Sequence, residues 1–542
     1  MGRGSWCEVE KPTPNTRFVI PKDPIPLIFR CADGVFIHLV IGAAGSKYKM
    51  YQALEIDDPS VSPNDSGMPT PTSDPKNFYG NIDLLAAHAA KKSSTELLER
   101  IWALGLPAEP VLAPGMCWDE PQVQHNGIIA TDADGTRHVG HPMKTSASPA
   151  PYKEPRKAAN PRPLDGVRVV DFGAFVAGPF ASVVLADLGA DIIKVETPAG
   201  DPNRSMYRWY TVANRGKRAI TIDLKNPEGQ ALARDLCASA DIVTNNFRSG
   251  VSARLGIDVA SLHALKPELI VLESPGYGSS GPLADRAAFD MVMQAFCGHE
   301  HRGGGEGNEP LWNRTSMVDF TGGFLGAVGT LAALYYRTRH GDGATIDCPL
   351  VNAGIALLSD LVQWPDGRFE GGAPLNPTRT GYRPAEALYQ ATDGWIALAV
   401  RGRKAAAALA TALGLDGRLD PDPLQWGAQE AAAVGAAIGA QACASAIATL
   451  EAAGVWVELC RRDGDQALLN DPALQAANTV QVSTHPQFGE VRELGAMVRF
   501  SRSSAGHRRH APLRGESTRE LLAELGRSAS DIDALAERKI VA

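Results

Sequence analysis

The stretch PLDGVRVVDFGAFVAGPFASVVLADLGADIIKVE (163–196) decides the fold of this chain. It contains two short apolar runs, VRVVDF (167–172) and DIIKVE (191–196), separated by an apolar helical pattern over residues 178–190. Apolar runs without alternation are typical of strands buried on both faces, and a helix between two of them predicts a parallel sheet. The stretch therefore predicts a β-α-β unit of an α/β protein.

The alternation of strands and helices continues downstream of this unit. Further strands are predicted at RAITIDL (218–224), DIVTNNF (241–247), LIVLESP (269–275) and ATIDCP (344–349). The pair Asn226-Pro227 predicts the start of a helix that runs to about residue 240, because Asn caps helices and Pro suits their first turn. Long, mostly apolar helices are predicted at 319–338 and 350–363.

Three short segments of the N-terminal part return in the same order near the C-terminus. The pairs are CADGVFIHLV (31–40) with ATDGWIALAV (391–400), LGLPAEPV (104–111) with AAGVWVEL (452–459), and DEPQVQ (119–124) with NDPALQ (470–475). One return after roughly 350 residues indicates a duplicated domain, because solenoid repeats recur at much shorter periods.

These patterns predict four parts for the chain of 542 residues. We expect a partial repeat over 1–150, a large domain over 160–385, a small α+β domain over 386–505, and a C-terminal segment over 506–542 that returns to the large domain. Loops or connectors are expected where Pro, Ser and charged residues gather, at 57–76, 144–164 and 502–514.

The composition is that of a soluble globular protein, with 44% hydrophobic and 21% charged residues. The net charge of −8 argues against nucleic acid as a partner. The run Phe320–Tyr336 is glycine-punctuated and slightly short for a membrane span, so we expect a buried helix and no membrane partner. The opening residues lack the apolar region of a secretory signal. The eight cysteines form no CxxC pair, so we expect reduced thiols, no metal site and a cytoplasmic location.

Two other motifs have some features of binding sites. The turn DFGAFVAGP (171–179) follows a strand and opens a helix, but it does not have the GxGxxG pattern of dinucleotide binding. Nicotinamide binding is therefore not expected, although the helix start at Gly178 offers N–H groups to an anion. The segment HEH (299–301), followed by GGGEG (303–307), is expected to be a flexible loop over the active site, because its spacing suits no metal.

Seven motifs in order resemble family III CoA-transferases of the carnitine and formyl-CoA transferase type. They are the stretch 163–204, NRGKRAITIDLKNPEG (214–229), DIVTNNFRSG (241–250), SPGYGSSGPLADRAAFD (274–290), MVDFTGG (317–323), TDGWIAL (392–398) and LRGESTRELLAELGRSASDIDAL (513–535). The resemblance covers residues 160–542 as one complete copy. Residues 1–150 are similar to a second small domain that lacks its large domain. The resemblance implies a parallel, Rossmann-like large domain without the GxGxxG fingerprint.

The resemblance also implies a mechanism. Family members pass CoA between carboxylic acids through a carboxylate nucleophile, which maps onto Asp319 in MVDFTGG. Covalent catalysis of this kind divides one difficult exchange into easier steps. We expect the helix start to favour the anionic form of Asp319. The expected substrates are an acyl-CoA thioester and a carboxylate acceptor, with no tightly bound cofactor and no metal.

Five positions correspond to the CoA-binding residues of the family: Ala177, Lys217, Asn246, Phe247 and Arg254. Lys217 and Arg254 are expected to meet phosphates. Three departures from the family pattern argue against a formyl or oxalate substrate. Thr197 and Pro198 stand where a basic residue often follows KVE, with Arg204 and Arg208 nearby to compensate. Val176 replaces a pocket glutamine, and the glycine-rich loop is reduced to Gly371-Gly372.

Alternatives remain at this point. The superfamily contains acyl-CoA racemases, which need a His-Asp pair where this chain has Phe289-Asp290. Racemase or lyase-type chemistry on the same fold is the alternative enzyme, and a non-catalytic CoA-binding protein is the alternative class. The family implies an interlocked homodimer. The N-terminal repeat is expected to carry no nucleophile and to dock on the complete copy in the same chain, or else on a partner chain that supplies the missing large domain.

Overall fold

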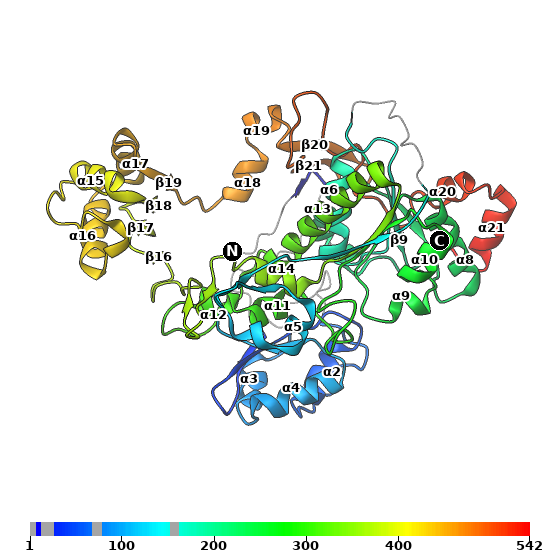
Figure 1. Cartoon of the computed structure of the whole chain (residues 1–542), viewed down its shortest axis with the longest axis horizontal. Coiled ribbons are helices and arrows are strands. Elements are labelled where there is room, and N and C mark those ends of the chain that lie inside the picture. The colour runs from blue at the N-terminus through cyan, green and yellow to red at the C-terminus, as the bar shows by residue number, and fades with distance from the viewer. Residues whose placement is uncertain (1–6, 12–26, 68–78, 152–161) are drawn as a thin grey trace. The chain divides into compact units, whose positions relative to one another are not determined.

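The computed structural model describes residues 7–11, 27–67, 79–151 and 162–542 (Figure 1). Its largest sheet is mostly parallel. Within these residues, the seven strands stand in the order β10-β9-β8-β11-β12-β13-β7. Their bounds are β7 Lys144–Ser148, β8 Arg168–Asp171, β9 Asp191–Glu196, β10 Arg218–Thr221, β11 Ile242–Asn245, β12 Ile270–Glu273 and β13 Gly343–Asp347. Only the β13–β7 pair is antiparallel among these neighbours. From β8 the chain adds β9 and β10 on one side, and then crosses to add β11, β12 and β13 on the other side of β8. The strand order therefore reverses between β8 and β11, and open α/β sheets bind ligands at such a switch point.

Helices cover both faces of this sheet, which explains the continuous apolar strands. Val169 and its neighbours pack under α6 (Ala177–Asp187) and α13 (Met317–His340), whereas Val170 faces α8 (Pro227–Ser239). The second face is completed by α20 (Thr518–Glu524) and α21 (Ala529–Glu537), so the C-terminal segment does pack on this domain. Other helices around the sheet are α7 Tyr207–Asn214, α9 Val251–Arg254, α10 Val259–Leu265, α11 Asp290–Cys297 and α14 Leu350–Ala356. The chain is therefore a mixed α/β protein, as predicted.

Residues 27–148, here called the N-terminal module, begin with the antiparallel sheet β2-β3-β4. The elements of the module are β2 Ile28–Arg30, β3 Phe36–Leu39, α2 Ser46–Ala53, α3 Ile82–Ala89, α4 Ser94–Ala103, β4 Ala108–Pro110, η1 Met116–Asp119, α5 Pro121–Asn126, β5 Ile129–Thr131, β6 Arg137–Val139 and then β7. Strands β3 and β4 pack against α11 of the large domain. The N-terminal module therefore packs on α11 of the same chain.

A second compact unit comprises residues 299–312 and 371–464. Its elements are α12 His299–Gly304, β16 Gly381–Arg383, β17 Glu386–Gln390, β18 Trp395–Ala399, α15 Gly402–Ala412, η3 Pro423–Gln425, α16 Ala428–Gly439, α17 Cys443–Ala452 and β19 Trp456–Leu459. From β17 to β19, two strands, three α-helices and a third strand follow one another, with the 3-10 helix η3 between α15 and α16. The described residues from β2 to β4 show the same order of strands and α-helices. The core of this unit is built around Ile396, Leu409 and Leu450.

Residues 465–505 belong to the first compact unit, rather than to the small domain expected over 386–505. They contain α19 Pro472–Ala476, β20 Val480–His485 and β21 Gly489–Leu494, preceded by α18 Gly464–Leu469. Strand β21 pairs with β20 on one side and with β1 (Cys7–Val9) on the other. The partner strand lies more than 470 residues away in the sequence, so no local pattern could indicate this boundary.

Three local expectations were wrong. The connector expected over 144–164 begins with the edge strand β7, whose polar residues are largely exposed and therefore show no apolar alternation. The helix expected over 350–363 is the shorter α14, and the loop expected at 299–307 begins as α12. Within the described residues, α13 alone is long and apolar enough to cross a membrane, but half of its most apolar window is buried.

The first prediction concerns the close approach of strands β12 and β13. A Cβ on Gly343 would lie 2.2 Å from the carbonyl oxygen of Pro267, which is backbone and cannot turn away. We expect Gly343→Ala to lower the free energy of unfolding by about 1–3 kcal/mol, measured by denaturant titration. As a control, Gly435→Ala in α16 places its Cβ 3.8 Å from the nearest atom, so stability should be unchanged or raised. Equal stability of Gly343→Ala and wild type would contradict the packing.

Candidate active site

The loop between β8 and α6 lies at the switch point and is held by Asn246. The side-chain oxygen of Asn246 accepts from the Ala174 N–H at 2.9 Å, and its amide donates to the Ala174 carbonyl at 2.8 Å. Ala177 begins α6 directly after this loop and is buried. A Cβ on Gly178 would lie 3.0 Å from Asn246, so the helix start and this asparagine are in close contact. The structure thus brings together two of the expected CoA-binding residues.

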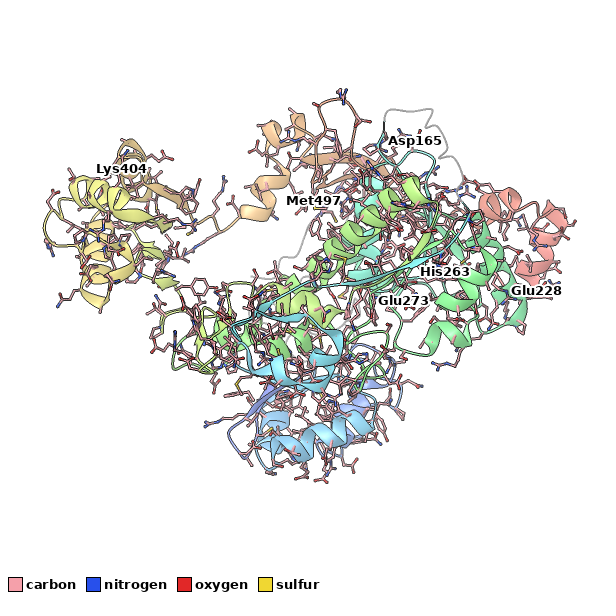
Figure 2. All side chains as sticks on the ribbon, in the orientation of Figure 1. Asp165, Glu228, His263, Glu273, Lys404 and Met497 are labelled. Atoms are coloured by element: carbon pink, nitrogen blue, oxygen red, sulfur yellow. The ribbon has the colours of Figure 1, made fainter. Side chains whose placement is uncertain are left out.

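A pocket of about 260 Å³ opens beside this loop, at the carboxyl ends of β11 and β12. Its lining includes Phe247, Arg248, Gly250, Glu273, Pro275 and Ser279. The exposed Arg254 lies at the rim, since a Cβ on Gly250 would be 3.5 Å from its guanidinium. Glu273 is labelled in Figure 2. Burial, and then the charge of Asp347, raises its pKa. The pocket therefore combines apolar side chains with Arg248 and with the carboxylates of Asp258 and Glu273.

Lys217 has a position that differs from the expected phosphate-binding role. Its ammonium is buried and donates to the Asp171 carboxylate at 2.8 Å, the Pro179 carbonyl at 2.8 Å and the Asn214 side chain at 3.2 Å. An ammonium has three donors, and all three are used here. Burial lowers the pKa of Lys217 to about 8. Lys217 is therefore a buried support of the loop, because its charge faces Asp171 rather than the pocket.

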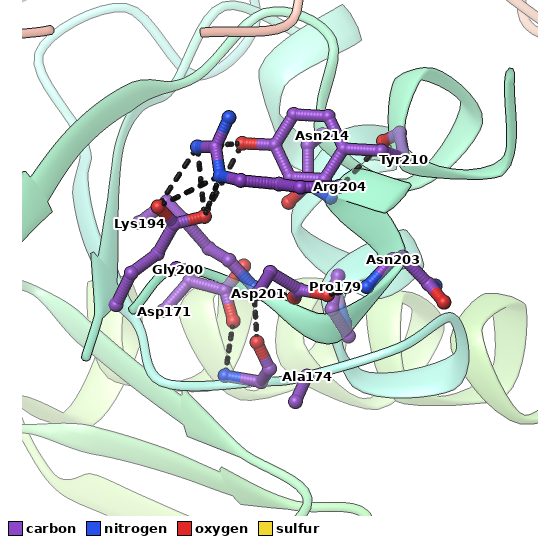
Figure 3. Close-up of polar contacts among 12 residues, drawn as sticks. Asp171, Ala174, Pro179, Lys194, Gly200, Asp201, Asn203, Arg204, Tyr210 and Asn214 are labelled. Carbon is purple, nitrogen blue, oxygen red and sulfur yellow. Dashed lines mark hydrogen bonds and ion pairs between the residues drawn. The ribbon is translucent and has the colours of Figure 1, made fainter. Parts of the chain in front are cut away.

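A second buried ion pair, Lys194–Asp201, lies close to Asp171 (Figure 3). Lys194 donates to Asp201 at 2.9 Å, and it also donates to the Gly173 carbonyl in the β8–α6 loop. Arg204, which we expected to replace a missing basic residue, instead pairs with Glu196 at 2.8 Å. Its guanidinium also lies over the ring of Tyr210, 4.2 Å from the centroid. The side chain of Arg208 lies outside the described residues.

Asp319 stands in the first turn of α13, and Asp290 of α11 caps that turn. One oxygen of Asp290 accepts from the N–H groups of Val318 at 2.8 Å and Asp319 at 3.2 Å. Gln294 donates to the other oxygen at 2.6 Å. Burial, and then the charge of Asp290, raises the pKa of Asp319 well above its ordinary value. The expected stabilisation of the Asp319 anion by its helix start is thus outweighed.

Two contacts connect Asp319 with the β8–α6 loop. Gly323, one turn after Asp319, would place a Cβ 3.0 Å from the Ala177 carbonyl, so α13 and the start of α6 touch. The Phe289 ring packs edge-on against Phe175, with centroids 5.0 Å apart. Phe175 has a positive φ of 62°, a conformation that few non-glycine residues adopt. The helix that carries Asp319 and the segment from the β8–α6 loop to Ala177 are therefore packed close together.

The sequence profile of CoA-transferase family III matches residues 10–162 and 164–518. The chain belongs to CoA-transferase family III. It is 32% identical over 403 residues to the succinyl-CoA–D-citramalate CoA-transferase of Chloroflexus aurantiacus, covering 70% of this chain and 98% of that protein. It is 27% identical over 381 residues to the mouse succinyl-CoA:glutarate CoA-transferase, covering 67% and 86%. Like these relatives, this member of family III is an enzyme that transfers CoA.

Solved structures agree with this membership. A crystal structure of a CAIB/BAIF family protein from Brucella suis superposes with a TM-score of 0.58 at 27% identity, covering 67% of this chain and 99% of that protein.

Sequence reasoning missed the buried charges of this family III site. Asp171 and Lys194 both stand inside or at the end of apolar strands, where an unpaired charge would be very costly. Charged residues in apolar strands could therefore have predicted the two buried ion pairs from the sequence. The sequence could not predict that Asp290 caps α13, because the 19 residues between α11 and α13 separate the capping side chain from the helix that it caps.

The second prediction tests the position of Lys217. Lys217→Met should leave the Asp171 carboxylate buried without its nearest cation, and such a loss costs about 3–5 kcal/mol of stability. Thermal unfolding should therefore shift strongly downward. Arg254→Met is the matched control, because that guanidinium is exposed and its loss should leave stability within about 0.5 kcal/mol of wild type. A Lys217→Met protein with wild-type stability and weak CoA binding would restore the phosphate-binding role.

Proposed function

We propose that this enzyme exchanges CoA between an acyl-CoA thioester and a carboxylic acid through a covalent intermediate on Asp319. The observation that carries the proposal is the contact between α13, which carries Asp319, and the Ala177 carbonyl at the start of α6. This contact brings a carboxylate close to the segment that corresponds to the CoA-binding loop of the family. Ala177, Asn246, Phe247 and Arg254 would bind CoA. Lys217 would act only by supporting the loop.

In the proposed chemistry, Asp319 forms a mixed anhydride twice, first with the donor acid and later with the acceptor acid. It attacks the thioester carbonyl and expels CoA thiolate, which leaves a mixed anhydride. The thiolate then attacks the Asp319 carbonyl, releases the donor acid and forms an aspartyl-CoA thioester. The acceptor carboxylate attacks that thioester, and the thiolate finally attacks the acceptor carbonyl, which regenerates Asp319. Asp290 would keep the first turn of α13 in place throughout.

We propose a dicarboxylic acid as one of the acids. The relatives described above are named for succinyl-CoA with citramalate or glutarate. Val176 and the reduced Gly371-Gly372 loop argue against a formyl or oxalate substrate. The assay that tests this uses succinyl-CoA as donor with glutarate, citramalate, malate, oxalate and acetate as acceptors, followed by chromatography of the CoA esters.

Racemase chemistry is less consistent with the site. A 2-methylacyl-CoA racemase needs a second base, and the equivalent position holds Phe289, whose ring packs on Phe175. A non-catalytic CoA-binding role would leave the half-buried carboxylate of Asp319, beside the buried Asp290, without a chemical function. Deuterium uptake at C2 of a branched acyl-CoA would favour the racemase over the transferase.

We further propose that the N-terminal module is a duplicate of the small domain and that the large domain is Rossmann-like. The family profile matches residues 10–162 separately from 164–518, which supports the duplication. In α5 and α19, Gln124 and Gln475 each donate to the carbonyl six residues earlier. Gly127 and Asn478 follow these helices, and both have positive φ. Each chain would then carry one active site.

The exposed apolar side of α13 supports the proposal of a homodimer. Phe324, Val328, Tyr335 and Tyr336 are exposed on this helix, with Val328 57% accessible. Large apolar patches of this kind mark protein interfaces. We also propose a cytoplasmic location, which the eight cysteines support because none forms a disulfide within the described residues.

The third prediction tests the nucleophile. Asp319→Asn keeps the shape of the side chain but removes the attacking oxygen charge, so transfer should fall by on the order of 10³-fold or more. CoA binding, measured by calorimetry, should persist. Hydroxylamine added to wild type with acyl-CoA should label Asp319 in peptide mass spectra, and the variant should remain unlabelled. Normal turnover by Asp319→Asn would remove this residue from the mechanism.

The fourth prediction concerns pH. Protonated Asp319 cannot attack, so activity should fall on the acid side at the raised pKa of the pair. The negative charge of Asp290 contributes to that raised pKa. Asp290→Asn removes the charge and retains an oxygen for the two N–H groups, so the acid limb of the kcat/KM profile should move to lower pH. Asp285→Asn, an exposed carboxylate in the same segment, is the control and should leave the profile unchanged. A limb that stays in place, or moves upward, would contradict the coupling.

A further inference from the structure

The loop 277–283 connects the two halves of the proposed site. It follows β12 and leads through residues 284–289 to Asp290 at the start of α11. On one side, Ser279 lines the pocket and donates from its hydroxyl to Asp347 at 2.8 Å. The position of this loop therefore affects the shape of the pocket and the approach to the Asp290–Asp319 pair.

Helix α5 of the N-terminal module holds the other side of this loop. The Gln122 amide donates to the carbonyls of Ser280 at 2.9 Å and Tyr277 at 3.2 Å, and its oxygen accepts from the Leu283 N–H at 2.7 Å. Asn126 also donates to the Tyr277 carbonyl, at 2.7 Å. Gln122 is fully buried, so its bonds replace those that the loop backbone would otherwise need from water.

Two glycines make room for the Gln122 side chain. A Cβ on Gly281 would lie 2.7 Å from the Gln122 amide, and one on Gly278 would lie 3.1 Å from it. Both glycines have positive φ, 103° and 146°, which other residues rarely adopt. The loop is therefore shaped to receive this amide from a segment about 150 residues upstream in the chain.

A salt bridge attaches the same loop region to the body of the N-terminal module. Arg286 pairs with Glu109 of β4 at 2.8 Å, and its guanidinium lies 3.7 Å from the ring centroid of Trp102. The hydroxyl of Tyr277 also donates to Glu109, which is buried. The loop is thus fixed at both of its ends by one module.

The corresponding helix near the C-terminus lacks these side chains. Helix α19 retains the proline that starts α5 and the glutamine equivalent to Gln124. The positions equivalent to Gln122 and Asn126 are Ala473 and Ala477, which have no side-chain hydrogen-bond donor. The contact with the loop therefore belongs to the N-terminal module alone, and the two similar segments are not interchangeable.

We propose that Gln122 is a positioning residue for CoA transfer, through which the N-terminal module holds the loop 277–283 and shapes the acyl-CoA pocket of its own chain. The inference rests on the proposed function, since the pocket is assigned to CoA there. It gives the additional module a role in substrate binding, although the module carries no nucleophile.

The test uses the full chain with Gln122→Ala, Gln122→Glu and, as matched control, Gln124→Ala on the same helix. Gln122→Ala should lower kcat/KM for succinyl-CoA by tenfold to about 10²-fold, mainly through KM. Gln122→Glu keeps the acceptor for Leu283 but loses both donors, so its effect should be intermediate. Hydrogen exchange at the Leu283 amide should be faster in Gln122→Ala and unchanged in Gln124→Ala, whose side chain donates to the Trp118 carbonyl within its own module.

The outcomes separate this inference from the proposed function. Wild-type KM and wild-type exchange at Leu283 in the Gln122 variants would overturn the inference, and so would faster exchange with an unchanged KM. If the alanine variant does not fold, Gln122→Glu decides by the same two readouts. If wild type transfers no CoA, the proposed function fails. Calorimetry with coenzyme A then decides the inference, since weaker binding by Gln122→Ala would support it and equal binding would overturn it.

Discussion

The Asp171 carboxylate has no access to solvent, and its need for hydrogen-bonding partners determines the conformation of the β8–α6 loop. It ends β8 and accepts hydrogen bonds from Lys217, from Ser182 of α6, and from the Gly173 N–H. Burial alone would raise its pKa, but the charges of Lys217 and Lys194 outweigh burial and hold that pKa at about 2. A buried pair is costly to desolvate and still more costly to break. The β8–α6 loop therefore has one strongly favoured conformation, and that loop carries Ala174 and leads directly to Ala177 at the start of α6.

The start of α6, which Asp171 helps to hold, is in turn packed against α13, the helix that carries the proposed nucleophile. Helix α6 lies against α13, and glycines on α13 allow this close approach. Asp290 then fixes the first turn of α13 by accepting two of its N–H groups, which would otherwise have no partner within the helix. A negative cap beside Asp319 also raises the pKa of the proposed nucleophile. The same side chain thus stabilises the helix start and affects the pKa of Asp319.

The N-terminal module shows that similar segments can acquire different uses. Its sheet packs on α11, and α5 reaches the loop that connects the pocket with Asp290. The sequence repeat indicated a small domain without a nucleophile. It did not indicate that Gln122 would lie in the site region, because the glutamine has the same local pattern whether it faces solvent or a backbone loop.

The sequence by itself determined the α/β class, the family and the position of Asp319 in a first helical turn. These follow from apolar runs, from motif order and from local helix signals, all of which are properties of neighbouring residues. Only the tertiary structure decided that Lys217 faces inward to Asp171, that β7 completes the large sheet, and that Asp290 caps α13. Each of these depends on a partner far away in the chain. The local sequence around a charge or an amide does not show which residue it will pair with, because burial and hydrogen-bond geometry in the whole fold select that partner.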